Sequence, residues 1–393
     1  MNQARPLNIF ISHASDFPTD WRLDGDGLIA NMFIRKLAAR GHNIHVAILN
    51  SDFREPFSKN VTLHAVDTGS RKNGPLARIR FALGVRKLLR QLSDQVHFDV
   101  IHQLNPVVKG LSIPLHNCGI PLVLGPYIPD WPYFLYKGKP SEPRLRQRIV
   151  NYLKKAVVYL QQRDANGIIL TTPAASSCVP FSASKAPITY CIPYGVETSF
   201  FLPSPLPQEK SILYLGRITT LKGALDLLQA FRIVQNAVPE SRLILAGNGA
   251  EQQAAQQLAA CAPNPDAITF YGTASREEIV DLMQKAWVCC MPSYGEPFGL
   301  VALEVFSSAR PLVGTNSGGL EYLITDDGGI RCAVGDIHAL ASALIQILQN
   351  REMASSMGAA NRALAVNVFD WKNIIPRVEA VYAKAAQHYQ QHE

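Results

Sequence analysis

The sequence predicts an α/β protein with two doubly wound, Rossmann-like domains, and three observations lead to that prediction. Short apolar runs recur along the chain and are separated by longer amphipathic stretches. The runs are continuously apolar, which is typical of strands buried on both faces of a parallel sheet. A proline-rich segment, FFLPSPLPQEK at 200–210, interrupts the series near the middle of the chain. We therefore expect two helix-covered parallel sheets.

The apolar runs and the stretches between them give the expected elements in order. In doubly wound sheets ligands bind beyond the carboxyl ends of the strands, so we expect a ligand cleft between the two domains. The expected domains are 1–197, 198–370 and a C-terminal helical segment, 371–393, that returns to the first domain. Strands are expected at LNIFIS, NIHVAIL, VTLHAV, DVIHQL, PLVLGPY, GIILTT and ITYCIPY, and then at SILYLGRI, RLILAGNG, AITFYGTA, AWVCCMPSY and RPLVGT. Helices are expected at 27–40, 76–92, 222–236, 250–260, 276–286, 298–309, 338–349 and 371–388.

Composition limits the class of protein. The 393 residues suit two or three domains, and 47% hydrophobic residues can form substantial cores. No apolar stretch reaches the length of a membrane-spanning helix, and the first apolar run is too short for a signal peptide. The seven cysteines form no CxxC pair, which favours reduced thiols. We expect a cytoplasmic protein, either free or held at the inner face of the cytoplasmic membrane.

Charge is distributed unevenly along the chain. Residues 1–200 hold 24 Lys and Arg against 13 Asp and Glu, whereas residues 201–393 hold 14 against 18. The two halves are therefore expected to face different partners, and the basic half suits an anionic one.

The stretch SYGEPFGLVALEVF, 293–306, carries two carboxylates in unusual places. Glu304 is the only charge in an expected helix with almost no polar face, so we expect it to be buried. A buried carboxylate needs hydrogen bonds. Backbone groups, Ser307 or Ser308 could supply them, or the diol of a ligand could do so.

The turn before that helix is a candidate anion site. Pro297 suits the first helical position and leaves Glu296 at the cap. The N–H groups of Phe298, Gly299 and Leu300 would then face the space in front of the helix, with Glu296 beside them. The alternative is an ordinary capping carboxylate.

A second candidate follows the first strand of the second half, in LYLGRITTLKG. Gly216 and Arg217 end the strand, and Lys222 follows near a helix start. Two cations at a strand end suit a diphosphate. Alternatively, both are ordinary solvated side chains.

Taken together, these pieces resemble the retaining nucleotide-sugar glycosyltransferases of family 4 (group 1), which have the two-domain GT-B fold. The resemblance covers the whole chain and is densest from 191 to 371. The segments that carry it, in the family's order, are IPYGVETSFF, YLGRITTLKG, LAGNGAE, FYGTAS, SYGEPFGLVALE, PLVGTNSGG, GGIRCAVGDIHALASAL and FDWKNI.

The resemblance implies roles for these residues. The residue at Glu304 holds the ribose hydroxyls of the donor, the one at Glu296 contacts the transferred sugar, and those at Arg217 and Lys222 neutralise the diphosphate. The remaining positions that it assigns to the donor site are Gly216, Phe298, Gly299, Leu300, Tyr271, Gly272 and Thr273, the last three lying near the base.

In the first half, DGDGLIANMF resembles the family's first glycine loop. Gly25 and Gly27 are therefore expected to face the diphosphate or the acceptor, with a plain turn as the alternative. Many relatives carry a histidine near the reacting centre, where this chain has Gly125, Pro126 and Tyr127. His102, at the end of DVIHQL, is the substitute candidate for acceptor contact, and the alternative is a structural histidine.

The function implied is retaining transfer of a sugar from a nucleotide-diphosphate sugar to a hydroxyl of a glycan or a lipid-linked acceptor, in cell-surface polysaccharide or glycolipid biosynthesis. Cations and a helix N-terminus would stabilise the leaving diphosphate, which would help to deprotonate the acceptor. A covalent carboxylate intermediate is not required. Neither a metal nor a cofactor is expected.

Two alternatives stay open: a nucleotide-sugar epimerase of the same fold, and an inactive protein that binds sugar nucleotides or membranes. A nicotinamide dehydrogenase is disfavoured because no GxGxxG follows the first strand. Nucleic-acid binding is not expected, because the basic half carries no motif that reads nucleic acid.

The stretch RKNGPLARIRFALGVRKLLR, 71–90, has seven basic residues and no acidic one. On a helix over 76–92, Phe81, Val85, Leu88, Leu89 and Leu92 share the face that packs on the sheet. The opposite face holds Arg80, Arg86, Lys87 and Arg90, with Leu76, Ile79 and Leu83 among them. This mixture suits an anionic membrane surface, reinforced by a second basic run at 137–155. A solvated face or a groove for a phosphorylated acceptor are the alternatives.

Overall fold

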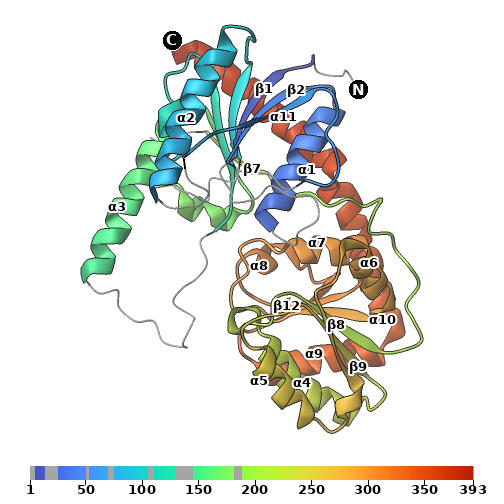
Figure 1. The fold of residues 1–393 in the computed structure, drawn as a ribbon. Coiled ribbons are helices and arrows are strands. Elements are labelled where there is room, and N and C mark those ends of the chain that lie inside the picture. Colours follow the sequence, from blue (N-terminus) through green and yellow to red (C-terminus); the bar gives the residue numbers. More distant parts are fainter. Residues whose placement is uncertain are drawn as a thin grey trace. The chain divides into compact units, whose positions relative to one another are not determined.

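The computed structural model describes residues 5–13, 25–49, 53–69, 75–104, 110–129, 145–180 and 188–392. These residues form two compact units, each built on its own parallel sheet (Figure 1). Unit 1 contains the described residues of Met1–Pro129, Glu142–Tyr194 and Lys372–Glu393, and the described part of unit 2 is Gly195–Trp371. The predicted α/β class with two Rossmann-like domains is therefore confirmed.

The units divide the chain slightly outside the expected limits of 197/198 and 370/371. Gly195 lies against Trp371, since a Cβ at Gly195 would meet the Trp371 ring at 2.5 Å. Val196 donates its backbone N–H to the carbonyl of Phe369 at 2.8 Å. These contacts join the segment that enters unit 2 to the segment that leaves it.

The sheet of unit 1 has seven strands in the order β3-β2-β1-β4-β5-β6-β7. All of its strand pairs are parallel, and β1 and β4 are the adjacent strands from which the chain winds outward on both sides. Ile9, Phe10 and Ile11 of β1 are fully buried, as a two-sided strand requires. The strands are β1 (Asn8–His13), β2 (Asn43–Ile48), β3 (Val61–Ala65), β4 (Val100–Leu104), β5 (Leu122–Tyr127), β6 (Gly167–Leu170) and β7 (Thr189–Cys191).

Helices cover both faces of this sheet. They are α1 (Gly25–Ala39), α2 (Pro75–Ser93), α3 (Leu145–Gln162) and α11 (Trp371–His392), with short 3₁₀ helices at Ile113–Leu115 and Pro173–Cys178. The C-terminal helix α11 packs within unit 1 from Lys372 onward. Its Glu379 accepts hydrogen bonds from Arg40 Nη2 at 2.9 Å and bonds to His42 Nε2 at 2.9 Å.

The sheet of unit 2 has six parallel strands in the order β10-β9-β8-β11-β12-β13. Its strands are β8 (Ser211–Leu215), β9 (Arg242–Ala246), β10 (Ile268–Gly272), β11 (Val288–Met291), β12 (Leu312–Thr315) and β13 (Gly329–Cys332). Its helices are α4 (Ala224–Ala237), α5 (Gln252–Ala260), α6 (Arg276–Lys285), α7 (Leu300–Ser307), α8 (Gly319–Leu323), α9 (Ile337–Gln349) and α10 (Arg351–Leu364), followed by a π-helical turn at Ala365–Phe369.

Four of the strands and α-helices, α3, α8, α10 and β13, were not expected from the sequence. Helix α10 buries small residues, among them Ala354, Gly358 and Asn361, so its apolar pattern is weak. At Gly358 a Cβ would lie 2.2 Å from the carbonyl oxygen of Ala309, and glycine therefore permits that close packing. Strand β13 has only four residues, one of which is Arg331.

Candidate active site

The strand order of unit 2 creates a switch point between β8 and β11. From β8 the chain proceeds through β9 and β10 on one side, and from β11 through β12 and β13 on the other. The loops that follow β8 and β11 therefore leave in opposite directions, and doubly wound sheets bind ligands at such a point. The predicted residues Gly216, Arg217 and Lys222 follow β8, and Glu296 follows β11.

Glycines allow the loops at this edge to touch backbone to backbone. A Cβ at Gly223, whose φ is +70°, would lie 2.0 Å from the carbonyl oxygen of Pro292. A Cβ at Gly318, whose φ is +56°, would lie 2.2 Å from that of Glu296. Since no other residue fits either position, the loops after β8, β11 and β12 hold one another in place.

Lys222 and Glu296 form an ion pair across the switch point. Lys222 Nζ donates to Glu296 Oε2 at 2.6 Å, and the two side chains are 18% and 9% exposed. The Ser293 hydroxyl donates to the same oxygen at 3.3 Å. Within the described residues, no hydrogen bond engages Glu296 Oε1. The structure thus brings together one predicted cation and one predicted carboxylate at the switch point.

Arg217 has a fixed backbone and an exposed side chain. The buried Tyr214 hydroxyl donates to the carbonyl of Arg217 at 2.6 Å, and Gly216 N–H donates to the carbonyl of Ala246 at 3.0 Å. Burial and, after it, the negative charge of Glu296 raise the pKa of Tyr214, which keeps its hydroxyl a donor. The Arg217 guanidinium makes no salt bridge with any described residue, so an anionic ligand can reach it.

The helix after β11 begins later than predicted. It starts at Leu300, with Gly299 at the N-cap in the left-handed region at φ +98°. The prediction that Glu296 caps a helix starting at Pro297 is therefore wrong. Gly319 N–H donates to the carbonyl of Glu296 at 2.6 Å, and this bond holds the segment as a loop. Phe298 and Gly299 lie in that loop, both buried.

Glu304 is half-buried and lies on the open face of α7, whereas the sequence predicted that it would be buried. It shares this face with Leu300 and Val301, which are also half-buried. The suggestion that serines satisfy it is wrong, because Ser307 donates to the carbonyl of Phe201 at 2.7 Å and Ser308 to Met283 Sδ at 3.2 Å. Burial raises the pKa of Glu304 to about 7, an effect that the charge of Arg276 opposes. No described residue hydrogen-bonds to this carboxylate, which leaves it available to a ligand.

Arg276 is a candidate site residue that the sequence reading missed. It begins α6, donates from Nη2 to Glu197 Oε2 at 3.1 Å, and lies 4.5 Å above the Phe200 ring. Its charge lowers the pKa of Glu304. A cation in the first turn of a helix opposes the helix dipole, and that signal in SREEI could have marked it. Ser293, which supports Glu296, carried no such signal.

The end of β10 presents the other predicted residues as a polar edge. Tyr271 is exposed, and its hydroxyl donates to Glu278 Oε1 at 2.9 Å. Gly272 has φ +81°, and its carbonyl accepts from Gly247 N–H at 2.7 Å. The exposed Thr273 has its hydroxyl 2.7 Å from the Asn248 amide. These residues are adjacent in sequence to an open strand end, as predicted, but their contact with a ligand stays a prediction.

The candidate site residues of unit 1, Gly25, Gly27 and His102, lie in environments that differ from those predicted. Gly25 and Gly27 lie in the first turn of α1, not in a loop, and Gly27 is buried. His102 is fully buried, with Nδ1 2.7 Å from the Tyr382 hydroxyl and Nε2 3.1 Å from the carbonyl of Gly125. Burial lowers its pKa to about 4. Both ring nitrogens are engaged and the ring is neutral, so we assign His102 a structural role and correct its placement among the catalytic residues.

His102→Leu should therefore lower stability rather than chemistry. The substitution leaves the Tyr382 hydroxyl and the Gly125 carbonyl without their buried partner, which costs about 1–3 kcal/mol. Thermal denaturation and the turnover of the folded fraction would measure the two effects separately. An unchanged melting temperature together with a large fall in turnover would restore the catalytic assignment.

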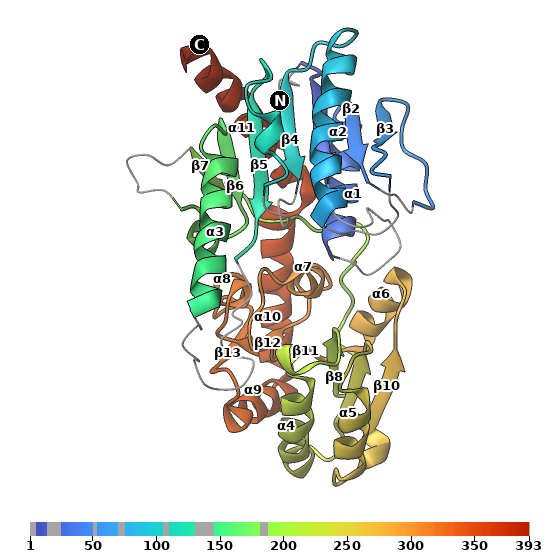
Figure 2. The same cartoon turned by 60° about the vertical axis from the view of Figure 1, so that its left-hand side comes forward.

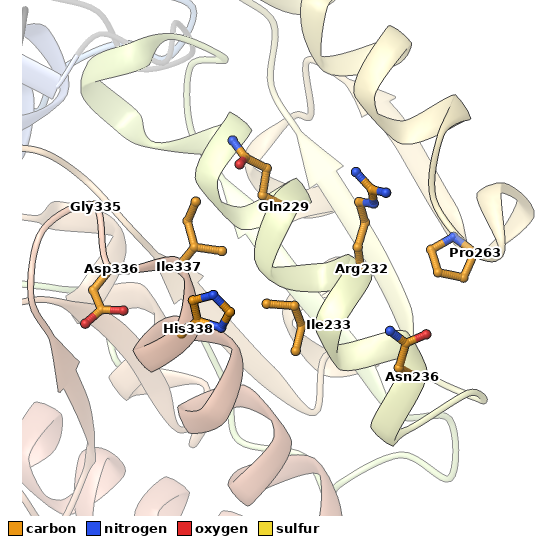
Figure 3. A pocket seen from close by; sticks show the side chains of 9 residues that line it. All are labelled: Gln229, Arg232, Ile233, Asn236, Pro263, Gly335, Asp336, Ile337 and His338. Carbon is orange, nitrogen blue, oxygen red and sulfur yellow. The ribbon is translucent and has the colours of Figure 1, made fainter.

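A separate open groove of about 710 Å³ lies between α4 and α9 (Figure 3). It is lined by Arg232, Asn236, Asp336 and His338, among others. None of the predicted site residues lines it. Elsewhere, no three His, Cys, Asp or Glu side chains of the described ranges are grouped as metal ligands would be.

Models of two protein families match successive parts of the chain. "Glycosyltransferase Family 4" matches residues 28–175, and "Glycosyl transferases group 1" matches residues 198–364. Among curated relatives, glycogen synthase of Mycobacterium tuberculosis is 33% identical over 46% of this chain. That alignment spans 44% of the relative, so this chain covers less than half of that protein's length.

Solved structures of other proteins are similar to this one over nearly the whole chain. Sucrose-phosphate synthase from Thermosynechococcus elongatus has a TM-score of 0.71 at 22% identity, covering 98% of this chain and 99% of that one. Anabaena HepE, solved in complex with UDP, has a TM-score of 0.71 at 16% identity, covering 96% and 100%. At these identities the two structures establish the fold alone.

Proposed function

We propose, from the premise that this chain belongs to the group 1 (family 4) glycosyltransferases, that it transfers a sugar from a nucleotide-diphosphate sugar to a hydroxyl of a glycan or lipid-linked acceptor with retention of configuration. The observation that carries the proposal is the cation pair at the switch point of unit 2. Lys222 and Arg217 lie after β8, and Lys222 is paired with Glu296 from the loop after β11. This arrangement suits a diphosphate bound at the strand ends.

The chemistry follows from where charge develops. Breaking the bond between the sugar and the diphosphate increases negative charge on the leaving oxygen, and fixed cations nearby lower the barrier. The exposed Arg217 and the partly covered Lys222 supply those cations. Because Lys222 already holds a carboxylate at 2.6 Å, a diphosphate would share or replace that partner. Glu296 would then turn an oxygen toward the hydroxyl groups of the transferred sugar.

Glu304 suits the ribose of the donor. A carboxylate can accept two hydrogen bonds from a vicinal diol, and Glu304 lies on the open face of α7 without a hydrogen-bond partner among described residues. Arg276 would favour its ionised form. Retention would follow from attack of the acceptor on the same face as the departing diphosphate, whose oxygen takes the acceptor proton.

A donor screen tests this function and its alternatives. The protein is incubated with UDP-, GDP-, ADP- and dTDP-sugars, with and without glycan or lipid-linked acceptors, and both nucleotide release and the sugar are analysed. A transferase releases nucleotide in an acceptor-dependent reaction. An epimerase would instead change the sugar without an acceptor, and an inactive binding protein would shift its melting temperature without turnover. HepE was solved with UDP, so UDP-sugars are the first to test.

Activity should survive chelation. Arg217 and Lys222 provide positive charge where a divalent ion would otherwise be needed to neutralise a diphosphate. We expect the initial rate in excess EDTA to stay within about twofold of the untreated rate, a difference of less than 0.5 kcal/mol. Loss of activity that Mg²⁺ or Mn²⁺ restores would overturn this expectation.

A further inference from the structure

We propose that α2 and α3 of unit 1 form a surface that docks on an anionic lipid bilayer. The observation behind the proposal is an unusual exposed face, in which apolar and basic side chains are interleaved on two helices of the same unit. The inference concerns where the protein is held, and it does not depend on the proposed sugar transfer.

The exposed face of α2 combines two kinds of side chain. Leu76, Ile79 and Leu83 are 60%, 57% and 58% exposed. Arg80 lies among them, and Lys87 and Arg90 continue the same face toward the C-terminal end. These positions recur at intervals of three and four residues, so they share one side of the helix. The opposite side packs on the sheet through Phe81, Val85 and Leu89 and, less deeply, Leu88 and Leu92, as predicted.

Arg86 was predicted to lie on this exposed face, but the structure places it elsewhere. Arg86 is half-buried, and its Nη1 donates to the carbonyls of Pro114 and His116, the latter at 3.0 Å. It therefore ties α2 to the 3₁₀ segment Ile113–Leu115 rather than facing solvent. The residue after that segment, His116, links it to α3, because His116 Nε2 forms a hydrogen bond with the carbonyl of Gln161 at 3.1 Å.

Helix α3 repeats the pattern. Tyr152 and Leu153 are 74% and 57% exposed, and Tyr159 and Leu160 are exposed further along. Lys154 and Lys155 lie between them, both exposed. The earlier part of the predicted basic run, 137–144, falls outside the described residues. Soluble helices expose scattered apolar residues, but an exposed pair of large ones beside two lysines is typical of helices that lie at a membrane interface.

The two helices belong to one side of the unit. Figures 1 and 2 both show α2 and α3 on the same side of the seven-stranded sheet. The contacts agree, since α2 packs on the core that contains Tyr127, and Gln161 of α3 donates to the Tyr127 hydroxyl at 2.9 Å. Their exposed faces therefore supply cations and apolar side chains to a common surface.

The charge of this surface favours an anionic lipid bilayer as its partner. Neither helix contains an acidic residue, and the described side chains include the exposed cations Arg80, Lys87 and Arg90 on α2 and Lys154 and Lys155 on α3. Such a surface attracts anionic headgroups, while leucine, isoleucine and tyrosine side chains enter the boundary of the acyl region. A soluble phosphorylated partner would use the cations but would leave exposed leucines without a role. No helix in the described ranges is long and apolar enough to cross a bilayer, so the contact proposed is peripheral.

Co-sedimentation with vesicles tests the proposal. The full-length protein is mixed at low salt with vesicles of phosphatidylcholine alone or with 30% phosphatidylglycerol added. We expect binding to the anionic vesicles, weak binding to neutral ones, and release at about 0.5 M NaCl, because salt screens the cations. Since each cation near an anionic surface contributes about fivefold in partitioning, changing Lys87, Arg90, Lys154 and Lys155 to Ser should weaken binding at least about a hundredfold.

An apolar variant and matched controls separate the membrane from other anions. Leu76→Ser, Ile79→Ser and Leu83→Ser together should also release the protein from anionic vesicles, while leaving its melting temperature unchanged because the three side chains are exposed. Two controls should bind like wild type: exposed apolar residues elsewhere, with Ile188, Leu202 and Val368 changed to Ser, and exposed cations elsewhere, with Arg232 and Lys285 changed to Ser.

Three results would overturn the proposal: no sedimentation with anionic vesicles at low salt, equal binding by the surface variants and the controls, or an apolar variant that binds as well as wild type. The last result would indicate a purely electrostatic site for a soluble polyanion. Binding to free inorganic phosphate or heparin without binding to vesicles would lead to the same conclusion.

Discussion

Changing Arg217 and Lys222 together to Ala should lower the rate of sugar transfer about 10⁴-fold or more. In the proposed site each cation would face the position where charge develops on the leaving diphosphate, and losing one such preorganised group costs about 10²–10³ in rate. The fold should tolerate the change. Arg217 is exposed, and Lys222 donates a hydrogen bond to Glu296 at 2.6 Å, so its removal takes that cation away from the carboxylate. Steady-state rates with the donor found in the screen measure the effect.

Controls make this result specific. Arg232→Ala with Lys285→Ala removes two exposed cations of the same unit that lie on other elements, and should keep the wild-type rate. Lys222→Arg keeps the charge but changes the geometry, so an intermediate rate is expected. The melting temperature of the double variant should fall by only a few degrees. Turnover near the wild-type rate in the double variant would show that the diphosphate site lies elsewhere.

Glu304→Gln should weaken nucleotide-diphosphate binding by about 10- to 150-fold. The range is that of losing hydrogen bonds to a charged acceptor, about 1.5–3 kcal/mol. The same substitution should stabilise the ligand-free protein. Burial raises the pKa of Glu304 from 4.5 to about 7, which means that the folded protein disfavours the ionised carboxylate.

The sign of the pH effect follows from that shift. Between about pH 4.5 and pH 7 the folded protein binds more protons at Glu304 than the unfolded chain does, so stability falls as pH rises through this window. Above pH 7 the loss is complete. Ligand-free Glu304→Gln should therefore melt higher than wild type at pH 8 and about equally at pH 4.5. In the wild type, UDP affinity should rise from pH 6 to pH 8, and in the variant it should not.

Thermal shift and titration calorimetry with UDP, at both pH values, measure these effects. Glu321→Gln is the matched control, since Glu321 is an exposed carboxylate of the same unit on α8. Equal stabilisation of wild type and Glu304→Gln by UDP would remove Glu304 from the binding site. A variant that melts lower than wild type without ligand would show that the carboxylate has a structural partner instead.

Local patterns predicted most of the framework. Continuous apolar runs identified the strands of both sheets except β13, and the position of Arg217 and Lys222 after β8 was evident because a strand end leads directly into the basic pair. The packing face of α2 followed from helical spacing alone. Helix α10 was not predicted because most of its buried residues are small, and β13 was not predicted because it is short.

Contacts between segments that are distant in the sequence could not be predicted from local patterns. The ion pair of Lys222 and Glu296 joins residues 74 positions apart, and it depends on the adjacency of β8 and β11. The late start of α7 depends on the bond from Gly319 to the carbonyl of Glu296. His102 was expected at the end of its strand, but it is the central residue of β4, and its ring lies 2.7 Å from the Tyr382 hydroxyl of α11. Each of these facts is set by tertiary packing, which overrides the local signal.

A crystal structure of the protein with UDP tests the central claim most directly, because it shows where a nucleotide diphosphate binds without requiring the acceptor. The diphosphate is expected within hydrogen-bond distance of Arg217 and Lys222, and the ribose hydroxyls within hydrogen-bond distance of Glu304. The base is expected at the end of β10, near Tyr271 and Thr273. Density for UDP in the groove between α4 and α9, or anywhere that leaves Lys222 and Glu304 without contact to the ligand, would contradict the assignment.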